Sequence, residues 1–327
     1  MIYLPTIRQL QYLVTLHHIG HFGRAAEACH VSQSTLSTGI RELETLLGAT
    51  LIERNRRIVR FTPLGEDVVK RAVRLLAEAD GIVEAARASG KPLAGDLRLG
   101  VIPTIAPFLL PALLPQLRRA WPELRLFLRE DQSATACEAL AAGQLDCLLL
   151  ALPYACGEIE YAHLLDDPIR LAYHPADYPG FPAAVSPEVI DESRLLLLED
   201  GHCLKDHALA ACSRAAFRPD SSMLGTSLYT LVQMVENRIG LTLVPQMAID
   251  GGILNGTSIV TRPLATPDAK REIVLAWRPS SPRADEYRLL TDALKTAYAA
   301  VKSADRESEI DRYSPDPTRD NMASPVV

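Results

Sequence analysis

The chain has 327 residues, of which 48% are apolar and 23% charged, with a net charge of −6. These values are typical of a folded protein with two or three packing units. No stretch approaches the roughly 20 consecutive apolar residues of a membrane span, and the N-terminus lacks the pattern of a secretory signal, so we expect a cytoplasmic protein without membrane contact.

The charge is unevenly distributed along the chain. Residues 1–62 hold seven arginines and four acidic residues, so this segment is +3 and the remainder is −9. A basic segment on an acidic body is typical of a nucleic-acid-binding module joined to another domain. The count alone does not separate this interpretation from an ordinary fluctuation of surface charge.

Residues 22–48 have the pattern of two crossing helices. Small residues in the first helix permit close packing, and Ser32 is placed to cap the second helix. In the second helix we expect Leu36, Ile40, Leu43 and Leu47 on the buried face. An ordinary solvated helix face is the alternative, but such faces are usually richer in Lys and Glu. The opposite face carries short hydrogen-bonding side chains and one arginine, which suit base edges in a major groove; with the cap, the predicted DNA-binding set is Ser32, Gln33, Ser34, Ser37, Thr38 and Arg41.

A basic run follows between two short apolar pieces. This pattern predicts a hairpin wing in which Arg54, Arg56 and Arg57 contact phosphates or a minor groove. A solvated charge cluster is the alternative interpretation of the same run.

A long helix is predicted from Pro63 to about Ser89. Proline is favourable at a helix start, and Gly90-Lys91-Pro92 ends the pattern. The helix has a continuous apolar seam, and a lone helix of this kind needs a partner. We expect the same helix of a second chain to supply it.

From residue 95 to about 302, strands and helices alternate. The β-α-β-α-β rhythm predicts a parallel sheet with helices on both faces, and the length allows two lobes with a ligand-binding crevice between them. Residues 303–327 are polar and punctuated by proline, which predicts a disordered tail. The predicted strands are 97–102, 124–129, 146–152, 169–174, 195–199, 241–245 and 273–277, and the predicted helices are 109–120, 134–142, 227–237 and 284–302.

Two of the six cysteines, Cys203 and Cys212, lie nine residues apart on one predicted helix. A continuous helix would hold them about 13 Å apart along its axis and on opposite faces. Because a disulfide needs Cα atoms within about 7 Å, the thiols can pair only if this helix refolds. Cys203 lies where the helix begins, so unbonded N–H groups and the helix dipole should favour its anion. A buried structural cysteine, beside a hydrogen-bonded structural His202, is the alternative.

The other four cysteines carry weaker signals. Cys147 and Cys156 are also nine residues apart, but Cys147 lies in an apolar strand and Cys156 in a loop without a cluster of donors. Cys29 and Cys137 are expected to be packing residues within helices. The chain has no cysteine or histidine spacing typical of zinc and no nucleotide-binding fingerprint, so we expect no metal and no cofactor.

The blocks Val-Ser-Gln-Ser-Thr-Leu-Ser (31–37), Leu-Ile-Glu-Arg (51–54) and Phe-Thr-Pro-Leu-Gly (61–65) resemble those of LysR-type transcriptional regulators, over residues 1–302. The resemblance implies a winged helix-turn-helix domain (1–62), a linker and dimerisation helix (63–90), and a two-lobed α/β regulatory domain of periplasmic-binding-protein-like form (95–302). It also implies homodimers or tetramers on double-stranded promoter DNA that contact RNA polymerase. Most members have proline where this chain has Ser34, a departure that leaves the fold and role in place and bears on base preference.

Residues 198–208, Leu-Glu-Asp-Gly-His-Cys-Leu-Lys-Asp-His-Ala, followed by Cys212, resemble the OxyR branch of that family. This resemblance implies that hydrogen peroxide oxidises Cys203, that Cys212 resolves it to a reversible disulfide, and that a thiol reductant resets the protein. It implies further contacts to peroxide or the reactive thiol from Thr104, Ser133, Asp206 (as proton shuttle) and Arg278. Beside Cys203, His202 and Lys205 are expected to add positive charge or donors.

Two alternatives remain open from the sequence. A LysR-type regulator with a metabolite in its crevice and idle cysteines would keep its regulation after Cys203→Ser. A thiol peroxidase with an accessory DNA-binding head would consume peroxide continuously. We expect a regulator and not an enzyme.

Overall fold

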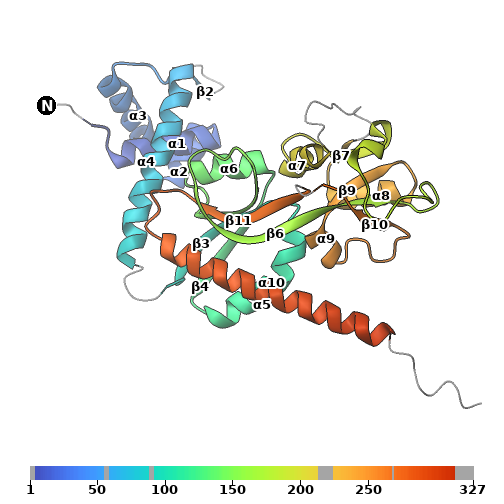
Figure 1. The fold of residues 1–327 in the computed structure, drawn as a ribbon. Coiled ribbons are helices and arrows are strands. Elements are labelled where there is room, and N and C mark those ends of the chain that lie inside the picture. The colour runs from blue at the N-terminus through green and yellow to red at the C-terminus, as the bar shows by residue number, and fades with distance from the viewer. Residues whose placement is uncertain (1–3, 55–58, 88–91, 213–223, 267–268, 314–327) are drawn as a thin grey trace, which may run out of the picture.

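The computed structural model describes residues 4–54, 59–87, 92–212, 224–266 and 269–313 (Figure 1). The N-terminal head consists of α1 (Ile7–Ile19), α2 (Phe22–Ala28), α3 (Gln33–Leu47) and the hairpin of β1 (Ile52–Arg54) with β2 (Val59–Phe61). These elements share one apolar core, in which buried leucines of α1 pack with Leu36 and Leu43 of α3. The winged helix-turn-helix expected from the sequence is therefore the observed arrangement.

Local sequence signals account for the bounds of α3. Ser32 Oγ accepts the Thr35 N–H at 3.1 Å, and Gly48 ends the helix with a φ of 63°. A Cβ added at Gly39 would lie 2.8 Å from the Tyr12 ring, so α1 and α3 cross at this glycine. Leu47, which the pattern places on the buried face, is 41% exposed, because the last turn of α3 extends beyond that crossing.

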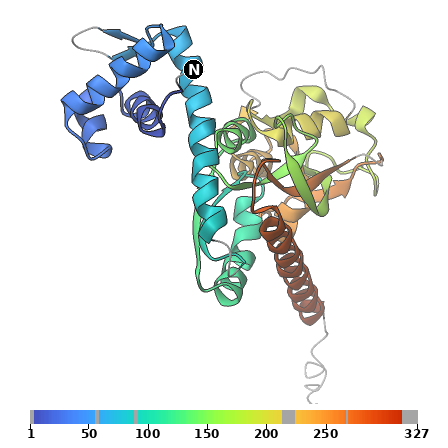
Figure 2. The same cartoon turned by 90° about the vertical axis from the view of Figure 1, so that its left-hand side faces the viewer.

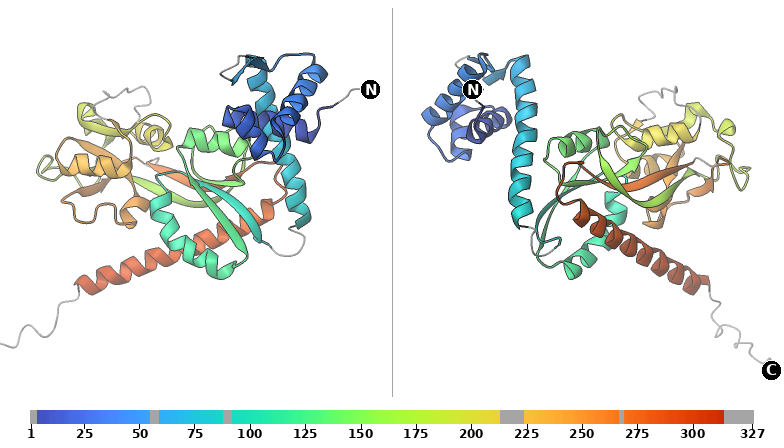
Figure 3. Two further views of the ribbon diagram at one scale, coloured as in Figure 1. Left: turned by 180° about the vertical axis from the view of Figure 1, so that it is seen from behind. Right: turned by 60° about the vertical axis from the view of Figure 1, so that its left-hand side comes forward.

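Helix α4 (Pro63–Arg87) connects the head to the regulatory domain (Figures 2 and 3). Val69 and Ala72 on its first half complete the core of the head. On its second half, Glu78 Oε1 accepts a 2.6 Å hydrogen bond from Ser280 Oγ, and Ala77 packs closely against Gly143. Part of the apolar seam of α4 is therefore buried within this chain. Other apolar side chains of the helix stay exposed: Leu64, Leu75 and Ile82.

The regulatory domain is built on one mixed sheet. Its first three strands are parallel, as predicted: β3 (Gly95–Val101), β4 (Leu124–Glu130) and β5 (Cys147–Leu152), connected by α5 (Ala106–Ala120) and α6 (Ser133–Ala141). The prediction of a parallel sheet throughout is wrong, because β11 (Lys270–Trp277) lies antiparallel between β5 and β6 (Glu160–Tyr173). β6 pairs beyond β11 with β9 (Leu241–Pro245), so this one long strand runs from the first lobe into the second.

The second lobe surrounds the far end of β6. The strand order is β4-β3-β5-β11-β6-β9-β7-β8, and β10 pairs with β6. Its elements are β7 (Leu195–Leu198), β8 (Leu224–Gly225), β10 (Val260–Pro263), α7 (Cys203–Ala211), α8 (Leu228–Glu236), α9 (Gln246–Asp250) and the short 3-10 turns Pro187–Val189 and Glu192–Arg194. Figure 1 shows α6 of the first lobe and α7 of the second facing each other near the junction of the lobes.

The final helix α10 (Ala284–Tyr313) is longer than predicted. It packs against α5 and β6 with its first half, and then continues past residue 302, where the sequence suggested that helix would end. The helix thus covers residues 303–313 of the segment expected to be disordered, and residues 314–327 lie outside the described chain. Across the described ranges, no helix is both long enough and apolar enough to cross a bilayer.

Candidate redox site and DNA-reading helix

Helix α7 holds Cys203 at its first residue and has Cys212 as its C-cap. Neither cysteine is in a disulfide, and each is at most 3% exposed. A turn at Gly201, with a φ of 95°, leads from β7 into the helix, which packs against β5, β7 and β11. The predicted helix between the two cysteines is confirmed, and its length keeps the sulfur atoms too far apart to bond.

Cys203 contacts the first lobe through Ser133 and β5. Its N–H donates to Ser133 Oγ at 3.3 Å, and Ser133 is the first residue of α6. Burial raises the pKa of the Cys203 thiol. The charge of Arg271, the Ser133 hydroxyl and the Ala151 N–H act against this rise. Burial therefore outweighs the stabilisation of the anion that we expected from the helix start. Arg271 is the principal group that opposes the effect of burial on the Cys203 pKa.

Arg271 is a buried cation with a complete set of partners. Its Nη1 donates to Thr104 Oγ1 at 2.7 Å, and its Nη2 donates to the Thr104 carbonyl at 3.0 Å. The guanidinium also pairs with Asp167 at 2.9 Å, and both charged side chains are at most 1% exposed. Asp167 Oδ1 accepts the Met247 N–H at 2.8 Å, which fixes the carboxylate. A buried charge of this kind is retained only where such partners compensate its loss of hydration.

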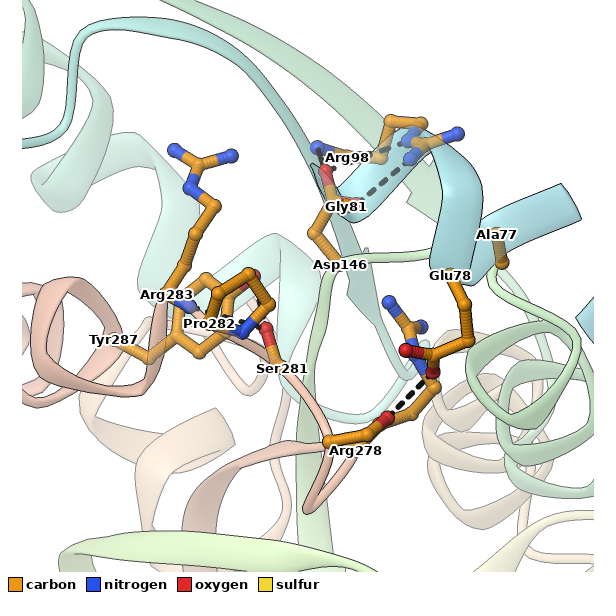
Figure 4. Close-up of a pocket in the computed structure, with 11 residues that line it drawn as sticks. Ala77, Glu78, Gly81, Arg98, Asp146, Arg278, Ser281, Pro282, Arg283 and Tyr287 are labelled. Atoms are coloured by element: carbon orange, nitrogen blue, oxygen red, sulfur yellow. Dashed lines mark hydrogen bonds and ion pairs between the residues drawn. The ribbon is translucent and has the colours of Figure 1, made fainter. Parts of the chain in front are cut away.

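Arg278, which the resemblance placed in the peroxide site, lies elsewhere. Its Nη1 donates to the carbonyls of Leu140 and Leu145, at 2.7 and 2.5 Å. In the β5–β11 pairing, Trp277 is opposite Cys147 at one end and Glu272 is opposite Leu152 at the other. Arg278 is thus at the end of the strand away from Cys203, where it lines a small pocket against α4 (Figure 4). Arg271, and not Arg278, is the arginine whose charge acts on Cys203.

The remaining polar residues of α7 have distinct surroundings. His202 Nε2 accepts a hydrogen bond from Gln132 Nε2 at 3.2 Å, and burial lowers the His202 pKa. Lys205 pairs with Asp200 at 2.6 Å. Asp206 is exposed in the first turn, and its charge acts weakly on Cys203. Of the sequence-predicted redox set, Ser133 and Asp206 act on Cys203 directly, Thr104 is connected to it through Arg271, and the His202 ring bonds Gln132. Arg278 lies apart from this group.

His207 fastens the middle of α7 to the first lobe. Its Nε2 lies 2.9 Å from the Pro153 carbonyl, so the ring donates there, while the buried Nδ1 has no hydrogen-bond partner within the described chain. Burial lowers the pKa of His207. This residue is missing from the sequence-predicted set, although its i+4 spacing from Cys203 placed it one turn further along the same helix.

Cys137 and Cys156 form a disulfide, with Cα atoms 5.1 Å apart. Cys137 lies within a helix and packs in the core, and Cys156 lies in a loop, as expected; the bond between them was not predicted. The bond joins α6 to the loop that follows β5. Cys147 is a buried strand residue, as predicted, and Cys29 caps α2 at its C-terminal end.

The predicted DNA-reading face of α3 is solvent-exposed. Ser32 and Ser34 share a 2.8 Å hydrogen bond at the start of the helix, and Arg41 projects from its third turn. Gln33 and Thr38 are also exposed, and Ser37 is half-buried. Of the wing residues, Arg54 ends β1 but its side chain is outside the described set, as are Arg56 and Arg57 entirely.

One surface cluster has ligand types that could bind a metal. His163, Asp166 and Glu272 place their ligand atoms within 4.8 Å of one another on β6 and β11. Lys270 Nζ already lies 2.5 Å from Asp166, so a cationic side chain occupies one of the two carboxylates of this cluster. We therefore assign no metal to it.

Comparison with known families defines the class. Residues 7–66 match the bacterial regulatory helix-turn-helix protein model of the lysR family, and residues 90–299 match the LysR substrate binding domain. The chain therefore belongs to the LysR family, whose members are DNA-binding regulators and not enzymes.

Individual relatives place the chain more narrowly. It is 43% identical to the HTH-type transcriptional regulator EstR of Acinetobacter baylyi, over 91% of this chain and 99% of the relative. It is 39% identical to the DNA-binding transcriptional dual regulator OxyR of Escherichia coli, over 88% and 94%. The structure of a full-length cysteine-to-aspartate variant of OxyR from Pseudomonas aeruginosa matches with a TM-score of 0.73 and 36% identity, covering 90% and 95%. The peroxide-bound structure of a cysteine-to-serine mutant of Corynebacterium glutamicum OxyR matches at 0.62 and 31%, covering 94% and 97%.

Proposed function

We propose that this protein is a LysR-type transcriptional regulator that senses hydrogen peroxide through Cys203. The observation that carries the proposal is the placement of Cys203 and Cys212 at opposite ends of one buried helix. The Cys203 N–H donates to Ser133, and the charge of Arg271, which is bonded to Thr104, acts on the Cys203 thiol. Relatives that are named as hydrogen peroxide-inducible genes activators support the same conclusion. The protein would act in the bacterial cytoplasm, on DNA.

The hydroxyl groups around Cys203 are arranged to donate. Arg271 is only a donor, so Thr104 Oγ1 accepts from it and keeps its own hydrogen for another acceptor. Ser133 Oγ likewise accepts the Cys203 N–H and directs its hydrogen to the sulfur. A thiolate and a peroxide oxygen both need such donors, and the buried positive charge of Arg271 favours negative charge at the same place.

The chemistry then takes two steps. The Cys203 thiolate attacks one peroxide oxygen, the O–O bond breaks, and the second oxygen leaves as hydroxide that is protonated to water. The product is a sulfenic acid at Cys203. The Cys212 thiolate attacks that sulfur and the S–O bond breaks, which forms a Cys203–Cys212 disulfide and a second water. A cellular thiol would reduce this bond and restore the helix.

The second step requires α7 to unfold. Its ends are held by the Ser133 contact and by burial, and its middle is held by the His207–Pro153 hydrogen bond. The new covalent bond would have to compensate the loss of these contacts. Residues released from α7 would alter how the two lobes pack, and thereby the spacing of the reading heads in a dimer or tetramer.

The DNA-binding part of the proposal rests on α3. Its exposed face, with Gln33, Thr38 and Arg41, would enter the major groove, while the arginines of the wing would contact the backbone. The exposed apolar side chains of α4 would be covered by a second chain. Bound in this way, the oligomer would contact RNA polymerase at its promoters.

One experiment tests this function against its two rivals. The footprint of the wild-type protein on its own upstream DNA should change with hydrogen peroxide, and the footprint of Cys203→Ser should not. A peroxide-dependent change that persists in Cys203→Ser would overturn the proposal. Peroxide consumption should stop near one equivalent per chain without reductant and stay slow with it. Rapid continuous consumption would instead indicate a peroxidase.

A further inference from the structure

We propose that Cys137 and Cys156 form a second redox couple, separate from Cys203 and Cys212, which is oxidised by low-molecular-weight disulfides such as oxidised glutathione. The observation behind it is the disulfide that joins the two elements of the first lobe that hold α7. In its oxidised state this bond fastens α7, and in its reduced state α7 opens more readily.

The disulfide joins α6 to the loop after β5, and apolar packing also holds α6 in place. Cys137 lies on α6, which packs against β3 and β5 through Ala136, Ala139 and Leu140. Cys156 follows β5 in the loop that leads to β6. Because apolar packing already holds α6 on the sheet, we expect the reduced pair to keep the same fold. A disulfide that the fold does not require can follow the redox state of its compartment.

The disulfide lies next to both attachments of α7. Cys137 is one helical turn beyond Ser133, whose Oγ accepts the Cys203 N–H. Cys156 is three residues beyond Pro153, whose carbonyl accepts from His207. Burial raises the pKa of Tyr154, in the same loop, and the charge of a Cys203 thiolate acts in the same direction. The disulfide therefore connects the segment that bonds the first turn of α7, through Ser133, to the segment that bonds its middle, through Pro153.

The surroundings of the pair favour exchange with a disulfide over reaction with peroxide. Both cysteines belong to the apolar core cluster, as Cys203 does, but the thiol of Cys203 also has the Ser133 hydroxyl and the charge of Arg271 acting on it. In the exchange, one thiolate attacks the small disulfide and releases one thiolate. The second protein thiolate then displaces the other, so two protein thiols lose two electrons and two protons and the small disulfide becomes two thiols.

The first test measures the couple itself in the full-length Cys203→Ser, Cys212→Ser chain, so that it does not depend on peroxide sensing. The protein is equilibrated in glutathione buffers from fully reduced to fully oxidised, trapped in acid, alkylated and mapped by mass spectrometry. We expect the Cys137–Cys156 peptide to pass reversibly from thiol to disulfide, while buried Cys147 stays a thiol. A pair that stays bonded in reducing buffer, or unbonded in oxidised buffer, would overturn the proposal. Mapping wild-type protein in the same buffers gives the same readout if the variant does not fold.

The second test measures the coupling to α7 without any peroxide. Amide hydrogen exchange of residues 203–211 is compared between oxidised wild type, reduced wild type and Cys137→Ser. Exchange should be several-fold slower in the oxidised wild type than in the other two samples, with Cys29→Ser, in the head, as the matched control that behaves as wild type. Equal exchange in all samples would refute the coupling, whatever the outcome of the peroxide experiments.

Discussion

Arg271 Nη1 donates a 2.7 Å hydrogen bond to Thr104 Oγ1, and this bond joins residues that are 167 positions apart in the sequence. Both side chains are almost fully buried. The bond gives the Thr104 hydroxyl a fixed orientation, with its oxygen toward the guanidinium and its hydrogen directed away from it. The proposed reaction of Cys203 with peroxide depends on this orientation.

Replacement of Thr104 by valine removes the hydroxyl but keeps the shape of the side chain. Because a hydrogen bond to a charged group contributes about 1.5–3 kcal/mol, we expect the rate constant for oxidation of Cys203 by peroxide to fall roughly 10- to 100-fold. Stopped-flow oxidation of the thiol measures it. Thr242→Val is the matched control, since Thr242 is equally buried but donates to Leu196 in the second lobe. Equal rates for the two variants would contradict the role of Thr104.

Two neighbouring ion pairs on β6 and β11 predict opposite outcomes for stability. Asp167 pairs with Arg271 in the core, so Asp167→Asn should lower the free energy of unfolding by about 3–5 kcal/mol. Asp166 pairs with Lys270 at the surface, so Asp166→Asn should cost less than about 1 kcal/mol. Urea unfolding of both variants measures the difference. Losses of the same size would show that burial of the Arg271 pair is incomplete.

Sequence patterns identified the local elements well. The helical periodicity and caps of α3, the first three parallel strands and the helix from Cys203 could all be predicted, because each depends on residues close together in the chain. Local patterns could not show that Arg271, and not Arg278, lies near Cys203. Both arginines belong to the same strand or its end, and only the pairing of β11 with β6 places Arg271 beside Asp167.

Long-range pairing explains the other errors. The antiparallel insertion of β11 depends on the course of β6 through both lobes, which no local pattern reveals. The Cys137–Cys156 bond links a helix to a loop 19 residues away. The sequence holds one signal of the β6–β11 pairing. Two acidic residues at 166–167 and two basic residues at 270–271 lie on apolar strands and have opposite charges.

Acid should loosen α7. Burial lowers the pKa values of His202 and His207, so the folded chain holds these rings neutral where the unfolded chain begins to protonate them. The folded chain has its full stability while both histidines are neutral, above the ordinary histidine pKa near 6.5. This stability is lost as the pH falls below that value. Hydrogen exchange of α7 should therefore be faster at pH 5.5 than at pH 7.5. His207→Asn keeps a donor for Pro153 but does not titrate, so it should reduce this difference; an unchanged difference would exclude His207 as its source.

The groove assignment of α3 predicts a specific loss of DNA binding. Arg41→Ala should weaken binding to the protein's own operator by about 1–3 kcal/mol and reduce discrimination against random DNA. Fluorescence anisotropy on both DNAs measures these two quantities. Arg125→Ala is the control, because Arg125 is an exposed arginine of β4 in the regulatory domain. Unaltered affinity of the Arg41 variant would place the reading surface elsewhere.

The central claim is that α7 separates Cys203 from Cys212 until peroxide oxidises Cys203. The most direct measurement treats wild-type protein with one equivalent of hydrogen peroxide, then follows the disulfide by mass mapping and the helix by hydrogen exchange in the same sample. The account predicts a Cys203–Cys212 bond together with loss of protection over residues 203–211. A bond that forms while this helix keeps its protection, or oxidation without this bond, would contradict it.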